Sequence, residues 1–489
     1  MLTHKKILIA ALAIYCLTAI FSTGYYHPDE HFQIIEFAEY KAGHNLASDL
    51  TWEYKARIRP ASQPALFYVL SYLLRLVGVS DNYVIIMIVR IITGIVSIVV
   101  ISLFVEKTKN NFDPLLQKLY LLLAYFLWFM PFLNVRFSSE TWSGFLFLTG
   151  IIFFYSQLKH KWFLMGVFLG LSFVFRFQTA FMSLGLLLWL LLIQKIQIRQ
   201  LCTIMLGAFF IFVGGTIIDY WFYQGFNLTF YNYFFENVVK NDAAHFGIFP
   251  WHFYITSLFE NAGFPIALLI IICLILYIFF YPKGIITWIL VPFIAVHLII
   301  PHKELRFMFP LVNLLPMIII GVLNRLFYLY TKFKSIRFLT DTIVVLLGTY
   351  NFIFLVMVML SPADKGYINM TEFITKNYKQ KKVHLYGYGV DDPYNTLYIL
   401  HQNYYGNKNV HFEFFKPPLL LNHNRSEVSL ILIHSADYMG WYNYRDLVNK
   451  KLKIVYTATP IWLFYFKAFL SDKYANENLY LFEVDKTKQ

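Results

Sequence analysis

The main pattern in this sequence is a series of apolar runs, each about as long as a membrane span, separated by short polar segments. A helix that crosses the hydrocarbon core of a bilayer needs roughly 20 apolar residues. The candidate spans are 7–23, 82–105, 115–133, 140–157, 162–175, 178–194, 201–220, 263–281, 284–300, 307–329 and 338–360. We therefore predict an all-α polytopic membrane protein with about eleven transmembrane helices.

The pattern changes after Ser361-Pro362, where long apolar runs give way to shorter segments. Strand-like segments are 382–388, 409–415, 428–434, 452–458 and 478–484, and helical segments 391–402 and 441–450 lie between them. This alternation is typical of a layer of strands covered by helices. We therefore expect a transmembrane domain over residues 1–362 and a small α/β domain over residues 363–489.

The net charge of +13 is large, but its placement does not indicate nucleic-acid binding. With the N-terminus in the cytoplasm, the inside segments contain Lys5, Lys6, Lys107, Lys109, Lys159, Lys161, Lys195, Arg199, Lys283, Lys332, Lys334 and Arg337. The short outside loops contain only Arg136, Arg176, Lys303 and Arg306. This bias follows the positive-inside rule. It places the long segments 24–81 and 221–262, and the C-terminal domain, on the extracytoplasmic side: the lumen of the endoplasmic reticulum or a bacterial periplasm.

Two adjacent acids, Asp29 and Glu30, follow the first span in the stretch His27-Pro28-Asp29-Glu30. Proline is favoured at the first position of a helix, and the helix dipole favours an ionised carboxylate in the first turn. The pattern predicts an amphipathic helix on the membrane surface. Its apolar face is Phe32, Ile34, Ile35, Phe37 and Ala38, and its polar face is Asp29, Gln33, Glu36 and Tyr40. An ionised acid at this boundary can act as a general base, although acids are also common at helix starts.

A second polar motif, His302-Lys303-Glu304-Leu305-Arg306, directly precedes an apolar run. Cations at a helix start oppose its dipole, so a bound anion such as phosphate would explain them. Snorkelling of long basic side chains to lipid headgroups is an equal alternative. A carboxylate base and a cationic phosphate clamp together suit transfer of a group from a lipid phosphate to a hydroxyl, with inversion at the anomeric centre.

Four blocks in this order resemble one known family. They are Pro28-Asp29-Glu30 followed by Phe32-Gln33, Leu50-Thr51-Trp52-Glu53-Tyr54, Gly247-Ile248-Phe249-Pro250-Trp251-His252-Phe253-Tyr254, and His302-Lys303-Glu304-Leu305-Arg306-Phe307. The sequence is similar here to glycosyltransferase family 22, the lipid-phosphomannose-dependent α-mannosyltransferases. That family includes late N-glycan mannosyltransferases of the endoplasmic reticulum and the GPI-anchor mannosyltransferases.

The resemblance implies a C-type glycosyltransferase fold that takes mannose from polyprenyl or dolichyl phosphate mannose. The acceptor would be a glycolipid or lipid-linked glycan, and the product an α-mannoside. Asp29 would be the base, with Glu30 beside it. The loop with His302, Lys303 and Arg306 would lie near the donor phosphate. Predicted substrate-binding residues in or beside the matching blocks are Trp52, Glu53, Arg57, Trp251 and His252.

No cofactor is indicated by the sequence, and no triad of metal ligands is visible, although the resemblance leaves a divalent metal open. The sugar is not fixed by the residues, so transfer of arabinose or glucose from a polyprenyl phosphate is an alternative. A transporter is another alternative, but its charges would lie at mid-span rather than at one face. A third alternative is an inactive structural relative. The presence of both Asp29 and the 302–306 loop argues against it.

Overall fold

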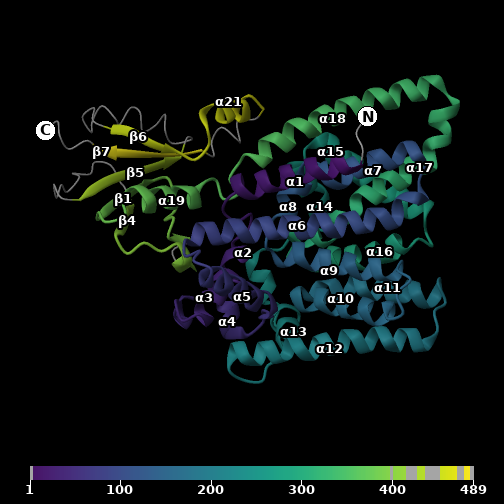
Figure 1. The fold of residues 1–489 in the computed structure, drawn as a ribbon, viewed down its shortest axis with the longest axis horizontal. Helices are drawn as coiled ribbons and strands as arrows, with labels where there is room; N and C mark the ends of the chain where they lie inside the picture. Colours follow the sequence, from purple (N-terminus) through teal and green to yellow (C-terminus); the bar gives the residue numbers. More distant parts are fainter. Residues whose placement is uncertain (1–3, 397–399, 415–426, 435–451, 471–477, 485–489) are drawn as a thin grey trace. The chain divides into compact units, whose positions relative to one another are not determined.

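The structure is a computed structural model that describes residues 4–396, 400–414, 427–434, 452–470 and 478–484 (Figure 1). The chain packs as two compact units. The helical unit contains the described residues up to Thr18, together with Trp52–Leu66 and Val89–Val356. The sheet unit contains Ala19–Thr51, Phe67–Ile88 and the described residues from Met357 onward. The first extracytoplasmic segment of the prediction is therefore shared between the units.

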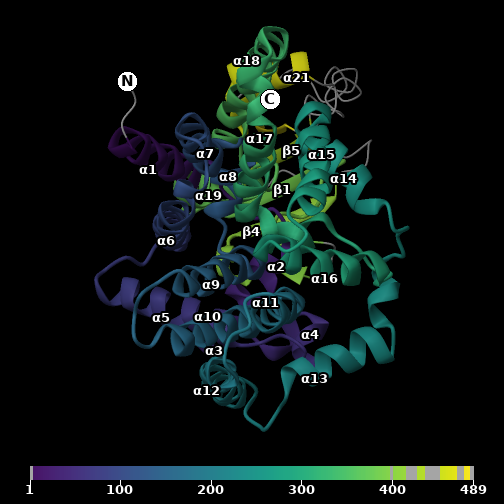
Figure 2. The same cartoon turned by 90° about the vertical axis from the view of Figure 1, so that its right-hand side faces the viewer.

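Most of the described chain is helical (Figures 1 and 2). The helices of the first half are α1 (His4–Phe21), α2 (Pro28–Phe32), α3 (Ile35–Lys41), η1 (Ala47–Asp49), α4 (Trp52–Ala56), α5 (Ser62–Leu76), α6 (Asn82–Thr108), η2 (Lys109–Asn111), α7 (Pro114–Phe126), α8 (Phe129–Asn134), α9 (Ser139–Phe154), α10 (Lys161–Phe175), η3 (Phe177–Thr179), α11 (Ala180–Leu192) and α12 (Ile198–Tyr223). The later helices are α13 (Thr229–Phe234), η4 (Phe235–Val239), η5 (Asp242–Phe246), α14 (Phe253–Ala262), α15 (Phe264–Phe280), α16 (Ile285–Ile299), η6 (Leu305–Leu314), α17 (Leu315–Lys332), α18 (Lys334–Met359), α19 (Tyr367–Asn377), η7 (Asn403–Tyr405) and α21 (Ile461–Leu470).

Among the described residues, five helical segments are long and apolar enough to cross a bilayer: His4–Phe21, Asn82–Asn111, Ile198–Tyr223, Leu305–Lys332 and Lys334–Met359. The shorter apolar segments are Pro114–Phe126, Ser139–Phe154, Lys161–Phe175, Phe177–Leu192, Phe264–Phe280 and Ile285–Ile299. Each predicted span falls on one of these segments. The chain is therefore the mostly helical, multi-pass membrane protein that the apolar runs predicted.

Close packing of the helical unit depends on small residues at helix crossings. In both views α10 lies between α9 and α12 (Figures 1 and 2). A Cβ atom added at Gly166 of α10 would lie 1.9 Å from the Ile204 carbonyl oxygen, and one at Gly207 of α12 would lie 2.3 Å from the Phe163 oxygen. Glycine lets the two backbones touch, which is how helices associate where lipid removes the hydrophobic driving force.

The sheet unit contains a five-stranded mixed sheet in the order β4-β1-β5-β7-β6. The strands are β1 (Val383–Tyr388), β4 (Val410–Phe414), β5 (Val428–His434), β6 (Leu452–Thr457) and β7 (Leu479–Val484). β1 is parallel to both β4 and β5, whereas β7 is antiparallel to β5 and β6. All five predicted strand segments are thus confirmed.

The sheet is buried through alternate side chains, as expected for strands covered on one or both faces. Leu385, Leu430 and Leu481 pack against Met370 and Ile374 of α19 in one core. The alternate residues Tyr386, Ile431, Ile433 and Phe482 form a second cluster. This pattern anchors α19, the first helix after the last span, on the sheet.

The predicted helix over 391–402 is wrong in its described part. A short antiparallel pair, β2 (Asn395–Thr396) and β3 (Leu400–His401), occupies this segment. The Asp392 side chain accepts hydrogen bonds from the Tyr394 backbone N–H and the Asn395 amide, so it closes a turn where a helix would begin. The predicted helix over 441–450 lies outside the described residues.

The predicted surface helix after Pro28 is also wrong in part. The helix breaks at Gln33 and Ile34, between α2 and α3. Half of its expected polar face is buried, because Gln33 and Glu36 are 8% and 2% exposed, whereas Asp29 and Tyr40 are partly exposed. The periodicity of the sequence separated two faces, but it did not predict that part of the polar face would be covered. By contrast, the later part of α5 leaves apolar side chains open, with Leu73 and Leu76 more than half exposed.

Candidate functional site

The stretch around Asp29 begins a helix as predicted. Pro28 is the first residue of α2, and the His27 ring Nδ1 caps the helix by accepting from the Asp29 backbone N–H at 3.2 Å. The Asp29 carboxylate lies 3.5 Å from the same ring nitrogen, and its side chain is 22% exposed. Asp29 and Glu30 both lie in the first turn. The helix dipole favours a carboxylate in this position.

Behind these acids, Glu36 holds the helix start to a distant part of the chain. Its Oε1 lies 2.7 Å from His31 Nε2 and accepts from the Tyr404 backbone N–H at 3.1 Å. Its Oε2 accepts from the Asn45 side chain at 2.5 Å. Burial raises the pKa of the neighbouring Tyr404 phenol well above its usual range. A buried carboxylate with three donors is a fully satisfied polar centre.

Aromatic rings extend this connection within the sheet unit. The His31 ring stacks on Tyr25 at 5.6 Å between centroids and on Tyr405 at 5.4 Å. Tyr405 in turn stacks on Tyr83 at 4.9 Å. Segment 402–405, which follows the β2–β3 pair, therefore packs against residues that hold α2 in place. The sequence pattern gave no signal for this long-range contact.

Glu140, in the first turn of α9, lies at the centre of a buried ion-pair cluster in the helical unit. Its Oε1 accepts from Arg176 Nη1 at 2.8 Å and from Arg306 Nη1 at 3.1 Å. All three side chains are less than a tenth exposed. Arg176 follows α10 and Arg306 begins η6, so three of the predicted outside loops meet at one carboxylate.

Arg306 has a second carboxylate partner on its other side. Its Nε and Nη2 donate to the two carboxylate oxygens of Glu304 at 2.5 and 3.0 Å. His302 Nε2 lies 2.9 Å from the same Glu304 carboxylate. The sequence argument required an anion to explain cations at this helix start. The structure supplies two internal anions, Glu304 and Glu140, so that argument alone does not establish a phosphate site.

Lys303, in the same loop, has a backbone partner instead of a carboxylate. Its ammonium donates to the Ile300 carbonyl at the end of α16, and the residue is 2% exposed. Burial lowers the pKa of the Lys303 amine. A lysine at the carboxyl end of a helix complements the helix dipole. Lys303 therefore caps α16 in this structure.

The aromatic block is tied to the His302 loop. The Phe249 backbone N–H donates to the Pro301 carbonyl at 3.0 Å, and His302 Nδ1 lies 3.2 Å from the Gly247 carbonyl. Phe246 stacks on Trp52 with 6.0 Å between centroids, and its ring lies 6.2 Å from His302. Three of the four sequence blocks thus meet in the helical unit.

Trp251 and His252 are close to this cluster in sequence but not part of it. Trp251 is 65% exposed, and His252, whose ring lies 5.6 Å from the indole, is exposed as well. Their predicted substrate contacts remain predictions. An exposed indole and imidazole beside apolar spans also suit the headgroup level of a membrane.

The loop after α4 is held by α13 and by the segment that precedes it. Arg57 has a left-handed backbone with φ of 53°, and its carbonyl accepts from Asn227 and Asn232. Glu53 lies 3.5 Å from Arg59. These bonds hold a strained backbone conformation in place and position Trp52 and Glu53.

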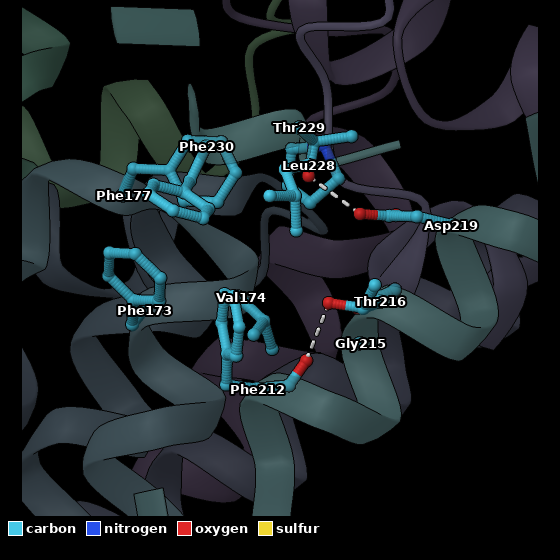
Figure 3. Close-up of a pocket in the computed structure, with 12 residues that line it drawn as sticks. Phe173, Val174, Phe177, Phe212, Gly215, Thr216, Asp219, Leu228, Thr229 and Phe230 are labelled. Atoms are coloured by element: carbon cyan, nitrogen blue, oxygen red, sulfur yellow. Dashed lines mark hydrogen bonds between the residues drawn. The ribbon is translucent and has the colours of Figure 1, made fainter. Parts of the chain in front are cut away.

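A hollow lies beside this loop, between α10, α12 and α13 (Figure 3). The hollow is small and partly open to the outside. Phe173, Phe177 and Phe230 line one side, and Asp219 lies at the other. The Asp219 carboxylate accepts from Thr229 at 2.6 Å and from the Ala61 backbone N–H at 2.7 Å. Asp219 therefore fastens the start of α5 to the end of α12.

The structure thus brings Trp52, His302 and Arg306 together in the helical unit, whereas Asp29 and Glu30 belong to the sheet unit. Sequence reasoning did not assign a role to Arg176, His31 or Glu36. Arg176 is a charged residue between two apolar runs, and this position could have marked it as a candidate. Its pairing with Glu140 could be found only from the tertiary structure. Among the described residues, no group of three or more His, Cys, Asp or Glu side chains is placed to hold a metal ion.

Residues 6–404 match the Alg9-like mannosyltransferase family, glycosyltransferase family 22. The match includes every candidate residue described above and ends at Tyr404, beside the Glu36 hydrogen bond. The chain belongs to this family of glycosyltransferases.

Three curated relatives are similar to this chain. GPI mannosyltransferase 3 of Candida albicans is 28% identical over 291 residues, which cover 59% of this chain and 57% of that protein. GPI mannosyltransferase 3 of Debaryomyces hansenii is 24% identical over 397 residues, covering 76% and 68%. Mannosyltransferase APTG1 of Arabidopsis thaliana is 25% identical over 319 residues, covering 63% and 56%. The chain spans somewhat over half the length of most of these relatives.

A solved structure can also be aligned with this chain over most of its length. The crystal structure of ArnT from Cupriavidus metallidurans bound to undecaprenyl phosphate aligns with a TM-score of 0.48 and 9% sequence identity, covering 98% of each chain.

Proposed function

We propose that this protein transfers mannose from a polyprenyl or dolichyl phosphate mannose to a glycolipid or lipid-linked glycan, forming an α-mannoside with inversion. The observation that carries this proposal is the family match over residues 6–404, which contains all the candidate residues. The GPI mannosyltransferases among the relatives favour a glycolipid acceptor. The C-type glycosyltransferase fold belongs to the same proposal.

In this mechanism Asp29 is the general base. It takes the proton from the acceptor hydroxyl as that oxygen attacks the anomeric carbon of the donor, and the lipid phosphate leaves on the opposite face. The first turn of a helix is a favourable place for a carboxylate charge, and the partial exposure of Asp29 leaves it accessible. Glu30 orients the acceptor or the donor sugar.

Arg306 is the cation that binds the donor phosphate, with His302 and Lys303 in the same loop. Bidentate pairing of a guanidinium suits phosphate oxygens better than a single ammonium does. Because Lys303 is turned to the end of α16, Arg306 bears most of this role. Trp52, Glu53, Arg57, Trp251 and His252 provide substrate contacts, and the site opens on the extracytoplasmic face.

The direct test is mannose transfer by the purified full chain. Radiolabelled polyprenyl phosphate mannose is mixed with extracted acceptor glycolipid, and the products are identified by mass spectrometry before and after α-mannosidase digestion. We expect a radiolabelled glycolipid product from which α-mannosidase releases the labelled mannose. Transfer from the arabinose or glucose donor instead would assign a different sugar. Movement of lipid across vesicles without any transfer would favour a transporter.

A further inference from the structure

The guanidinium of Arg306 has two sides with different surroundings. Its inner Nη1 contacts Glu140, whose side chain is 3% exposed and is also held by Arg176. Its outer edge, Nε and Nη2, is covered by the Glu304 carboxylate, whose side chain is 23% exposed. A ligand that approaches Arg306 through the more exposed side must therefore meet Glu304 first.

A carboxylate and a phosphate bind this edge in the same way. Both place two oxygens opposite two parallel N–H groups of a guanidinium. Glu304 thus occupies the position that two phosphate oxygens would take. When displaced, its carboxylate keeps a nearby partner, because His302 Nε2 lies 2.9 Å from Glu304 Oε1 and the ring is anchored at Gly247.

We propose that Glu304 is an internal competitor for the lipid phosphate at Arg306. It covers the guanidinium when no lipid phosphate is bound, yields to the donor, and helps to expel the lipid phosphate product. Glu140 and Arg176 keep Arg306 in place during the exchange. This inference rests on the proposed role of Arg306, but it concerns phosphate binding and does not depend on which sugar is transferred.

The test measures binding rather than turnover. The full chain in lipid nanodiscs is titrated with a polyprenyl monophosphate, with the uncharged polyprenol of the same length, and with inorganic phosphate. Glu304→Gln keeps the side-chain shape but removes the competing charge. We expect it to bind the polyprenyl phosphate about tenfold more tightly, since a charge-assisted contact is typically worth about 1.5–3 kcal/mol and each 1.4 kcal/mol is tenfold. Binding of the polyprenol should not change.

The matched control is Glu236→Gln, which removes a carboxylate paired with Lys240 elsewhere in the predicted outside segment. It should bind all three probes as the wild type does. Glu304→Asp, which keeps the charge but draws it back from Arg306, should show a smaller gain and serves if Glu304→Gln does not fold. If Glu304→Gln also binds inorganic phosphate more tightly than the wild type does, Glu304 competes with the phosphate group itself and not with the lipid chain. That result would support the proposal.

Kinetics with the donor separate this role from simple support of Arg306. We expect Glu304→Gln to lower the apparent KM for donor and to strengthen inhibition by the polyprenyl phosphate product, with kcat reduced where product release limits turnover. Unchanged or weaker polyprenyl phosphate binding in folded Glu304→Gln and Glu304→Asp would overturn the proposal. Absence of mannose transfer by the wild type, with the binding gain retained, would overturn the proposed function and leave this inference standing.

Discussion

Asp29 and His31 are two residues apart, yet their surroundings differ sharply. Asp29 is about one-fifth exposed at the start of α2, whereas His31 is 1% exposed and enclosed by Glu36, Tyr25 and Tyr405. A partly open acid can exchange a proton with a substrate, but a buried and paired ring is suited to support. At the scale of single residues, the proposed base and the histidine two residues after it therefore have different surroundings.

This separation predicts unequal effects of two neighbouring substitutions. Asp29→Asn keeps the shape and one acceptor oxygen but cannot take a proton, so transfer should fall by about 10²–10⁴-fold. Glu30→Gln, the control in the same helical turn, should cost less. The measurement is initial transfer rate with purified enzymes of equal thermal stability. Near-normal turnover by Asp29→Asn would remove Asp29 from the mechanism, and failure of Glu30→Gln alone would exchange the two roles.

At the scale of elements, α2 has only five residues and cannot be stable alone. It is held by contacts from far along the chain: the Tyr404 backbone on Glu36, the Tyr405 ring on His31, and the Gln402 amide on the Tyr25 hydroxyl at 2.6 Å. The C-terminal part of the protein therefore contributes directly to the conformation of the proposed catalytic helix.

We expect Glu36→Gln to loosen this support. The amide cannot accept as strongly from His31, Asn45 and the Tyr404 backbone, and loss of a buried charge-assisted partner typically costs about 1–3 kcal/mol. Hydrogen exchange should accelerate in residues 28–41 and 400–405 together. Glu413→Gln, whose partner His411 is exposed, is the control and should leave both segments unchanged. Faster exchange in only one segment would show that they are not coupled through Glu36.

The crossing of α10 and α12 gives a second prediction at this scale. Gly207→Val places a side chain where a Cβ atom lies 2.3 Å from the Phe163 carbonyl oxygen, so the helices must separate. Overpacking of this kind costs about 1–3 kcal/mol. Gly214→Val on the same helix meets nothing within 4 Å and serves as the matched control. Thermal unfolding in detergent should be lowered by the first variant only; equal melting of both would contradict the close packing.

At the scale of the whole molecule, two cations from different predicted outside loops meet at one end of the helical unit. Arg176 and Arg306 come from different loops and converge on Glu140, so the amino end of α9, the carboxyl end of α10 and the start of η6 lie at the same end of the helical unit. Successive helices that alternate in direction are what the charge bias requires.

The membrane side of these ends can be measured by labelling single cysteines. In a background with Cys16, Cys202 and Cys273 replaced by serine, Ser48→Cys and Lys381→Cys introduce exposed thiols in two segments predicted to be extracytoplasmic. An impermeant maleimide applied from the extracytoplasmic side should label both. Lys195→Cys, in a predicted cytoplasmic loop, should react only after the membrane is opened. The reverse pattern would invert the topology.

The sequence by itself determined the membrane class, the positions of the apolar helices and the five strands of the sheet, because these depend on local hydrophobic periodicity. It also located the acids at the α2 start and the 302–306 loop, since each motif is contiguous. Only the tertiary structure decided what surrounds them. Arg306 pairs with Glu140, and segment 402–405 contacts Glu36. These partners are far apart in the sequence, so local hydrophobic periodicity cannot predict that they meet. The pairing of Arg306 with Glu304 also depends on the folded conformation of their loop. The burial of Glu36 likewise reversed an amphipathic prediction, because periodicity distinguishes two faces of a helix but does not say what will cover each.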